Sequence, residues 1–146
     1  MQIIFLNGVP DMFKLVSISE DCLVQVWNVS VSTGDITSHV QFQTLSPPVA
    51  AALINNRACV VSHDVSTHRS VTTMYDYMNK GTLSHRIVDD HESPVFSVIA
   101  CHKLRIFATV AHDGVIKFWD EQNMLVSYIF TPYRPFQSHY FAAAHC

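Results

Sequence analysis

Glycine is scarce in this sequence of 146 residues: the chain has four, scattered at positions 8, 34, 81 and 114. That number and spacing exclude a glycine-rich loop of the kind that cradles phosphate. Lysine and arginine form no cluster and the formal net charge is −3, which argues against nucleic-acid binding through the phosphates. No apolar run reaches eighteen residues, so the sequence predicts no membrane span.

Paired cysteines and a secretory signal are also missing. The four cysteines lie at positions 22, 59, 101 and 146, and no two form a Cys-x-x-Cys pair. The first 20 residues lack the basic start and long apolar core of a signal peptide, because the segment 7–11 interrupts them. We therefore expect an intracellular protein with reduced thiols.

Two segments of the chain echo each other. Residues 15–28 and 107–120 each contain two alternating apolar runs split by a turn, with an aspartate in the turn and a tryptophan six positions later. The tryptophans, Trp27 and Trp119, are 92 residues apart, which is two periods of 46. A middle unit should then end near residue 73, where Tyr75 and Asp76 stand. The segments 46–49 and 92–95 (Ser-Pro-Pro-Val and Glu-Ser-Pro-Val) mark matching starts, again 46 apart.

With Trp119-Asp120 closing the last unit and Trp27-Asn28 closing the first, the pattern resembles the WD40 repeat, whose period is roughly 40–45 residues. The resemblance implies an all-β fold in which each unit is one four-stranded antiparallel blade of a β-propeller. It covers residues 1–132, with blades at about 1–44, 45–90 and 91–132. Because closed propellers have four to eight blades, three blades predict an incomplete, open arc.

Two further expectations concern the C-terminal residues and the alternative fold. Residues 133–146 carry no repeat pattern, so we expect a disordered tail and a partial or alternatively ended product of a longer WD-repeat protein. A β-sandwich would also show short strands at this spacing. It would not produce the echo at 46 residues, which favours the propeller.

In the WD40 family, each blade contains a buried hydrogen-bond network of four residues. They are a histidine before the first strand, a residue with a hydroxyl on the second strand, an aspartate in the next turn, and the tryptophan. Such a satisfied network makes its blade rigid. In the last unit the matching residues are His91, Thr109, Asp113 and Trp119. In the first unit they are Asp21, Trp27 and either Ser17 or Ser19.

The middle unit departs from this pattern. Leu45 takes the place of the histidine, and Tyr75-Asp76 takes the place of Trp-Asp. Asp64 lies eleven residues before Tyr75, against six residues in the other units, so the turn has gained five residues. We expect a lengthened loop over 63–70 and a degenerate blade that has lost the network and is held by packing.

The nine histidines raise a metal-dependent alternative. His63 and His68 have the spacing of one half of a zinc site, but no suitable cysteine pair precedes them. A metal-dependent hydrolase that uses the histidine-rich loop 63–68 is therefore the enzymatic alternative. Solvated loop histidines are the simpler reading, with no catalytic residue, metal or cofactor.

The function implied by the resemblance is a non-catalytic scaffold that binds other proteins through its propeller face and loops. Self-association through the open end blades is a further expectation, because exposed sheet edges pair with other chains. By analogy of fold alone, the place of such a protein is the cytoplasm or a cytoskeletal or ciliary assembly. A third reading is a truncated product without independent function.

Overall fold

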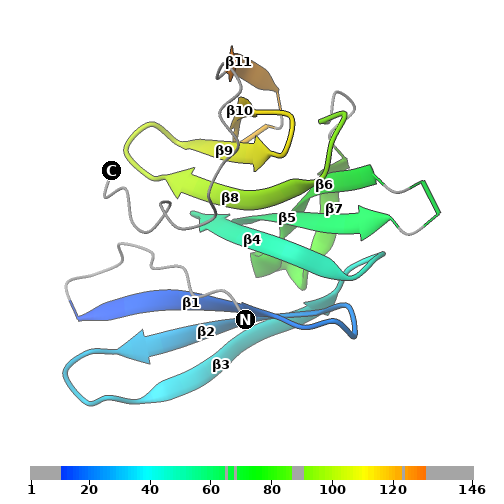
Figure 1. Ribbon diagram of the computed structural model, residues 1–146. Helices are drawn as coiled ribbons and strands as arrows, with labels where there is room; N and C mark the ends of the chain where they lie inside the picture. Colours follow the sequence, from blue (N-terminus) through cyan, green and yellow to red (C-terminus); the bar gives the residue numbers. More distant parts are fainter. Residues whose placement is uncertain (1–10, 65, 68, 87–90, 123, 131–146) are drawn as a thin grey trace.

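The computed structural model describes residues 11–64, 66–67, 69–86, 91–122 and 124–130. Within these residues the chain forms three antiparallel sheets and one short 3-10 helix, η1 (Tyr77–Asn79) (Figure 1). The predicted all-β fold with an open array of antiparallel sheets is confirmed: the sheets do not close into a ring or barrel. No helix in the described part of the chain is long and apolar enough to cross a membrane.

Each sheet is built from consecutive strands. The first sheet contains β1 (Met12–Ile18), β2 (Leu23–Ser30) and β3 (Ile36–Gln43). The second contains β4 (Pro48–Ile54), β5 (Arg57–Asp64), β6 (Arg69–Asp76) and β7 (Thr82–Arg86). The third contains β8 (Val95–Cys101), β9 (Ile106–Ala111), β10 (Val115–Asp120) and β11 (Leu125–Phe130). The first ten residues of the predicted first blade and the tail at 133–146 lie outside the described residues.

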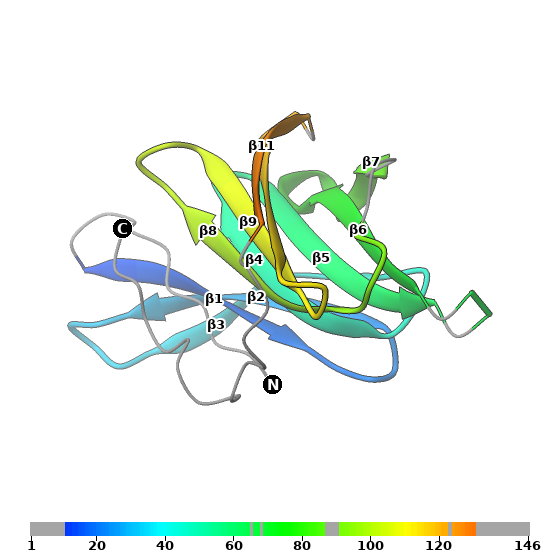
Figure 2. The same ribbon diagram turned by 45° about the horizontal axis from the view of Figure 1, so that its top comes forward.

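The second sheet lies between the other two, and β4 contacts both β1 and β8 (Figures 1 and 2). This position explains why the buried residues 50–54 and 58–61 form continuous apolar runs. A strand with one buried face alternates apolar and polar residues, whereas a strand covered on both faces is apolar throughout. Ala50 and Ala52 face the third sheet, Ala51 and Leu53 face the first, and all four are fully buried.

Two apolar clusters hold the three sheets together. The first junction, between the first and second sheets, contains Val16, Val24, Val26, Phe42, Ala51, Leu53, Ala58, Val60, Tyr75 and Tyr77. The second junction, between the second and third sheets, contains Ala50, Ala52, Ile54, Cys59, Val61, Met74, Val95, Val98, Phe107, Ala111 and Trp119. Burying one large aliphatic or aromatic side chain is worth about 1.5–3 kcal/mol, so these junctions supply most of the cohesion between sheets.

Side-chain size increases across the second sheet from β4 outward. β4 carries three successive alanines, Ala50 to Ala52, at the place where the neighbouring sheets approach it. β6 carries the large side chains of Met74 and Tyr75, one toward each neighbouring sheet. Small residues near β4 and large ones near β6 let the sheets converge at one side and diverge at the other.

Aromatic packing and one glycine shape the first junction. The rings of Phe42 and Tyr75 lie 5.0 Å apart between centroids at a tilt of 35°. Gly81 follows the 3-10 helix with φ +72, a left-handed conformation that glycine adopts without a Cβ clash. A Cβ added at Gly81 would overlap the Cβ and Cγ atoms of Phe42. The chain therefore needs glycine at this position for both backbone and packing reasons.

The expected loop over 63–70 is wrong in its extent. β5 continues to Asp64 and β6 begins at Arg69, so His63 pairs with Ser70 and Asp64 pairs with Arg69. The five extra residues lengthen the hairpin by added strand pairs, and only its tip is a turn. Polar residues in these pairs gave no apolar alternation by which a strand is recognised.

Candidate functional site

One aromatic residue occupies the same register position in all three sheets. Trp27 pairs with Leu15, Tyr75 with Ala58, and Trp119 with Phe107. In each sheet, pairing with the next strand shifts register directly before this aromatic, at Val26/Trp27, Met74/Tyr75 and Phe118/Trp119 respectively. A bulge of this kind bends the strand and re-aims its side chains. The repeated bulge is a structural echo that sequence spacing alone did not predict.

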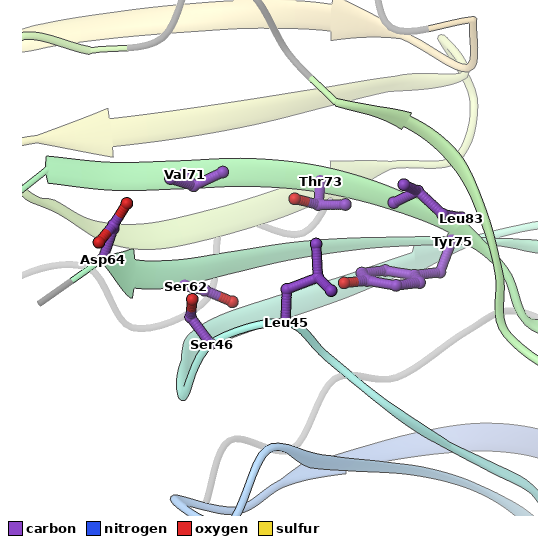
Figure 3. Close-up of a pocket in the computed structure, with 8 residues that line it drawn as sticks. All are labelled: Leu45, Ser46, Ser62, Asp64, Val71, Thr73, Tyr75 and Leu83. Atoms are coloured by element: carbon purple, nitrogen blue, oxygen red, sulfur yellow. The ribbon is translucent and has the colours of Figure 1, made fainter. Parts of the chain in front are cut away.

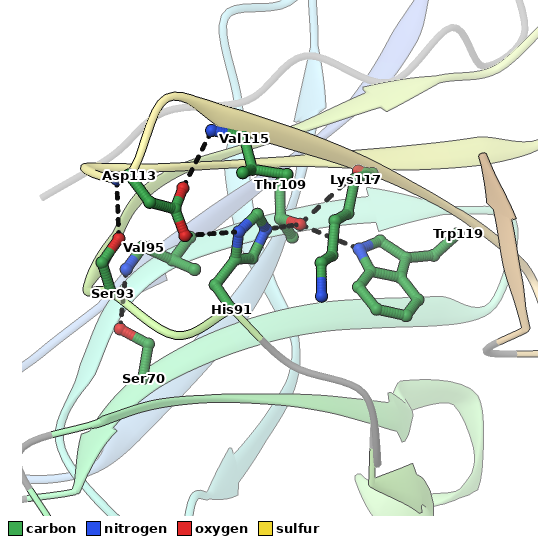
Figure 4. Close-up of polar contacts among 9 residues, drawn as sticks. All are labelled: Ser70, His91, Ser93, Val95, Thr109, Asp113, Val115, Lys117 and Trp119. Atoms are coloured by element: carbon green, nitrogen blue, oxygen red, sulfur yellow. Dashed lines mark hydrogen bonds and ion pairs between the residues drawn. The ribbon is translucent and has the colours of Figure 1, made fainter. Parts of the chain in front are cut away.

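In the third sheet, four predicted residues come together (Figure 4). The indole Nε1 of Trp119 donates to Thr109 Oγ1 at 2.8 Å, and His91 Nε2 lies 2.8 Å from the same oxygen. His91 Nδ1 lies 3.8 Å from Asp113 Oδ2. Thr109 is fully buried and His91 is 3% exposed, so water does not compete with these contacts. The cluster is called the third-sheet network below.

Thr109 Oγ1 is the atom shared by the contacts of this network. The hydroxyl donates to the Lys117 carbonyl oxygen at 3.5 Å and lies 2.8 Å from His91 Nε2, where the tautomer of the imidazole decides which of the two groups donates. Trp119, Thr109, His91 and Asp113 thus form one connected row of polar contacts.

Asp113 also holds the turn between β9 and β10. Its Oδ1 accepts the N–H of Val115 at 2.8 Å, and its own N–H donates to Ser93 Oγ at 2.7 Å. Gly114 in this turn has φ +77, which explains the Asp-Gly sequence. The aspartate therefore couples the turn to the buried histidine.

A separate hydrogen bond joins the third sheet to the second. The N–H of Val95 at the start of β8 donates to Ser70 Oγ on β6 at 2.8 Å, and Ser70 is 3% exposed. This bond was not predicted from the sequence, because the two residues belong to different units and neither has a local signal.

The first sheet carries a reduced version of the network. Trp27 Nε1 donates to Ser17 Oγ at 3.0 Å, so Ser17 and not Ser19 contacts the indole. Asp21 Oδ1 accepts the N–H of Leu23 at 3.3 Å in the turn. Cys22 stands in this turn with φ 67, at the position that Gly114 has in the third sheet.

In the second sheet the predicted residues are placed apart. Asp64 Oδ1 accepts hydrogen bonds from Ser66 N at 2.9 Å, Ser66 Oγ at 2.6 Å and Thr67 N at 3.4 Å, and those from Ser66 lower the pKa of this exposed carboxyl most. Asp76 caps η1 by accepting the N–H of Asn79 at 3.2 Å and lies 3.9 Å from Arg57. Tyr75 packs in the first junction, and burial raises the pKa of its hydroxyl.

A cavity of about 220 Å³ lies where the second sheet departs from the network (Figure 3). Its lining consists of Leu45, Ser46, Ser62, Asp64, Val71, Thr73, Tyr75 and Leu83. In Figure 3, Leu45 lies between the hydroxyl of Tyr75 and Ser62, with Asp64 at the opposite end from Tyr75. Thr73 pairs with Val60, as Lys117 pairs with Thr109 in the third sheet. The second sheet thus has an open pocket of apolar walls and hydroxyl groups at the position of the third-sheet network.

Elsewhere in the first junction, Lys14 and Tyr77 form a polar contact. Lys14 Nζ donates to Tyr77 Oη at 3.4 Å and lies 4.8 Å from the ring centroid, a cation–π distance. The Tyr77 hydroxyl donates to the Asn55 carbonyl. Burial, with a smaller effect of the Asp76 carboxylate, raises the pKa of Tyr77 to about 12, and burial lowers the pKa of Lys14. Both groups are part of the packing between sheets.

The histidine-rich segment of the enzymatic alternative lies at the tip of the β5–β6 hairpin. His63 belongs to a strand pair, Asp64 is used in its turn, and His68 lies outside the described residues. Among the residues that the structure describes, no three histidine, cysteine, aspartate or glutamate side chains are grouped as metal ligands.

Comparison with known proteins gives a likeness of fold. No family model and no curated protein sequence matches the chain. The chain is similar to the crystal structure of Raptor from Chaetomium thermophilum, with a TM-score of 0.63 and 18% sequence identity. The match covers 88% of this chain and 12% of the Raptor chain, so the chain spans about an eighth of that protein. The likeness agrees with an open, partial β-propeller as the fold of the described residues.

Proposed function

We propose that this chain is a non-catalytic scaffold of the WD-repeat type that binds other proteins. The observation that carries this proposal is that the histidine, threonine and aspartate of the third-sheet network serve a structural role. His91 contacts both Thr109 and Asp113 in a largely buried network that ties a turn to a strand and makes the sheet rigid. A rigid framework that presents loops and a pocket is the architecture of a binding protein.

The repeated aromatic supports assignment of the three sheets to the WD40 type. It recurs at one register position with a bulge directly before it, and in two sheets its indole N–H donates to a hydroxyl on the preceding strand. A β-sandwich gives no reason for the same bulge in three separate sheets.

The pocket of the second sheet is the docking point that we assign to a protein partner. Leu45, Val71 and Leu83 offer apolar contact, while the hydroxyls of Thr73 and Tyr75 offer hydrogen bonds. An apolar side chain that ends in a polar group, presented by a partner protein, fits this combination of walls. We assign the interaction an intracellular setting, where thiols such as those of Cys22 and Cys101 stay reduced.

The test blocks the pocket and leaves the fold intact. Leu83→Trp fills the mouth of the pocket from a residue that is 53% exposed, and Leu104→Trp adds the same side chain at a 68% exposed site that does not line the pocket. In quantitative affinity purification followed by mass spectrometry, we expect wild type and Leu104→Trp to retain the same proteins and Leu83→Trp to lose them. Equal retention by all three chains would remove the pocket from the proposal.

A second readout concerns the absence of catalysis. Wild-type protein and His63→Ala are compared on generic ester, phosphate and peptide substrates, with and without added zinc. We expect no turnover above buffer for either chain. Turnover by wild type that His63→Ala abolishes would overturn the scaffold and establish the metal-dependent hydrolase in its place.

A further inference from the structure

The two junctions inside the chain are built from two different kinds of sheet face. On one side of each junction is the face that carries the repeated aromatic, Tyr75 in the first junction and Trp119 in the second. On the other side is the opposite face of the preceding sheet, represented by Val26 and by Met74 respectively. Each junction therefore joins the face that carries the repeated aromatic to the opposite face of the preceding sheet, always in the same order along the chain.

Each end sheet retains one face of this kind. Trp27 and Leu15 alternate with Val16 and Val26, which pack in the first junction, so Trp27 and Leu15 point away from the second sheet. Ile36 pairs with Val29 on this same face and is 63% exposed. These residues define the first end face, which carries the repeated aromatic of the first sheet.

The second end face lies on the third sheet, opposite Trp119. Phe118 precedes Trp119 directly and is the counterpart of Met74, which precedes Tyr75. Ile116 pairs with Ile129 on this face, and Ile129 is 50% exposed. This face is opposite to the repeated aromatic, and among the described strands no sheet packs against it or against the first end face.

We propose that the two end faces are the two halves of one further junction, formed between two copies of this chain. The Trp27–Ile36 face of one copy packs on the Phe118–Ile129 face of the other, in the order that the first and second junctions already use. The second copy is the occupant that the structure favours, because it carries the complementary half at matching register positions. An interface between different patches of identical chains is heterologous and either closes or grows.

Closure at two copies follows from the number of sheets. Two chains with three described sheets each bring six sheets together, which is within the four to eight of closed propellers. Each copy then contributes both of its end faces, and the assembly contains two equivalent new junctions. The expected product is a closed dimer.

Light scattering after size-exclusion chromatography tests this proposal with charge placed at the exposed rim of each face. Ile36→Glu and Ile129→Glu alter one end face each, and Leu104→Glu is the control at an exposed apolar site in a turn. We expect wild type and Leu104→Glu to have twice the 16.5 kDa mass of one chain, and both end-face variants to be monomers with unchanged circular dichroism. A wild-type monomer at all concentrations would overturn the proposal.

The pattern across variants also identifies the kind of contact. If only one of Ile36→Glu and Ile129→Glu dissociates the dimer, the contact joins identical faces, and the head-to-tail junction is wrong. If an end-face variant fails to fold, hydrogen exchange of wild type decides: the proposal requires β2, β3, β10 and β11 to gain protection together as protein concentration rises. Hydrogen-exchange protection that does not change with protein concentration would overturn a second copy as the occupant of these faces.

Discussion

Removing the Thr109 hydroxyl without changing the volume of the side chain is the most direct perturbation of the third-sheet network. Thr109→Val leaves two buried nitrogen atoms, Trp119 Nε1 and His91 Nε2, without their shared partner, each of which is 2.8 Å from that oxygen. A buried polar group that loses its partner costs about 1–3 kcal/mol, so we expect a loss of roughly 2–6 kcal/mol in the free energy of unfolding. Urea denaturation followed by tryptophan fluorescence measures this loss.

Two control variants separate the hydrogen bonds from packing. Thr109→Ser keeps the hydroxyl and removes one methyl group, for an expected loss of about 1 kcal/mol. Ser17→Ala removes the corresponding hydroxyl of the first sheet, where the indole of Trp27 is only half-buried and gains water instead, so its loss stays below about 1 kcal/mol. The network would be refuted as a stabilising unit if Thr109→Val lost no more stability than Thr109→Ser at an unchanged denaturant slope.

Three more predictions follow from contacts described above. In Gly81→Ala the new methyl group has a positive φ and also overlaps the side chain of Phe42, whereas in Gly34→Ala the φ of +74 is similar but the surrounding space is open. Thermal or urea unfolding should therefore show a loss of roughly 1–2 kcal/mol in the free energy of unfolding for Gly34→Ala and a clearly larger loss for Gly81→Ala. The pKa of Tyr77 is raised from 10.0 to about 12, so the contribution of its neutral hydroxyl to stability is complete below pH 10 and is lost as pH rises toward 12. Urea unfolding at a series of pH values over this range should show the free energy of unfolding fall by up to about 3 kcal/mol, and Tyr77→Phe should reduce this fall. Asp113→Ala should destabilise by roughly 1–3 kcal/mol and Asp113→Asn by less, because asparagine still accepts the turn hydrogen bond, and equal melting temperatures for wild type and Asp113→Ala would contradict this role.

Much of the arrangement was predictable because its signals are local or periodic. Trp27 and Trp119 mark the same position in their units, and the Asp-Gly turn at 113–114 marks the hairpin between them. A period of 46 then placed Tyr75 in the corresponding position of the second sheet. The apolar run of 49–54 lies in β4 (Pro48–Ile54), where residues 50–54 are buried on both faces.

What escaped prediction depends on contacts between distant residues or on polar strands. The pairs His63–Ser70 and Asp64–Arg69 extend a hairpin, and no apolar alternation identifies them. The hydrogen bond from Val95 N–H to Ser70 Oγ joins two sheets, and no local sequence pattern around either residue predicts it. The pocket is a consequence of Leu45 lying where the family pattern has a histidine, and its volume is set by several residues far apart in the sequence.

The three successive alanines of β4 have a consequence for curvature. Because side chains grow from Ala50–Ala52 on β4 to Met74 and Tyr75 on β6, the second sheet acts as a wedge between its neighbours. This wedge sets the angle between neighbouring sheets, and the angle determines how many sheets complete one full circle. Larger side chains at Ala51 or Ala52 would flatten the wedge and raise that number, so the composition of one short strand sets the circumference of any ring that this chain can join.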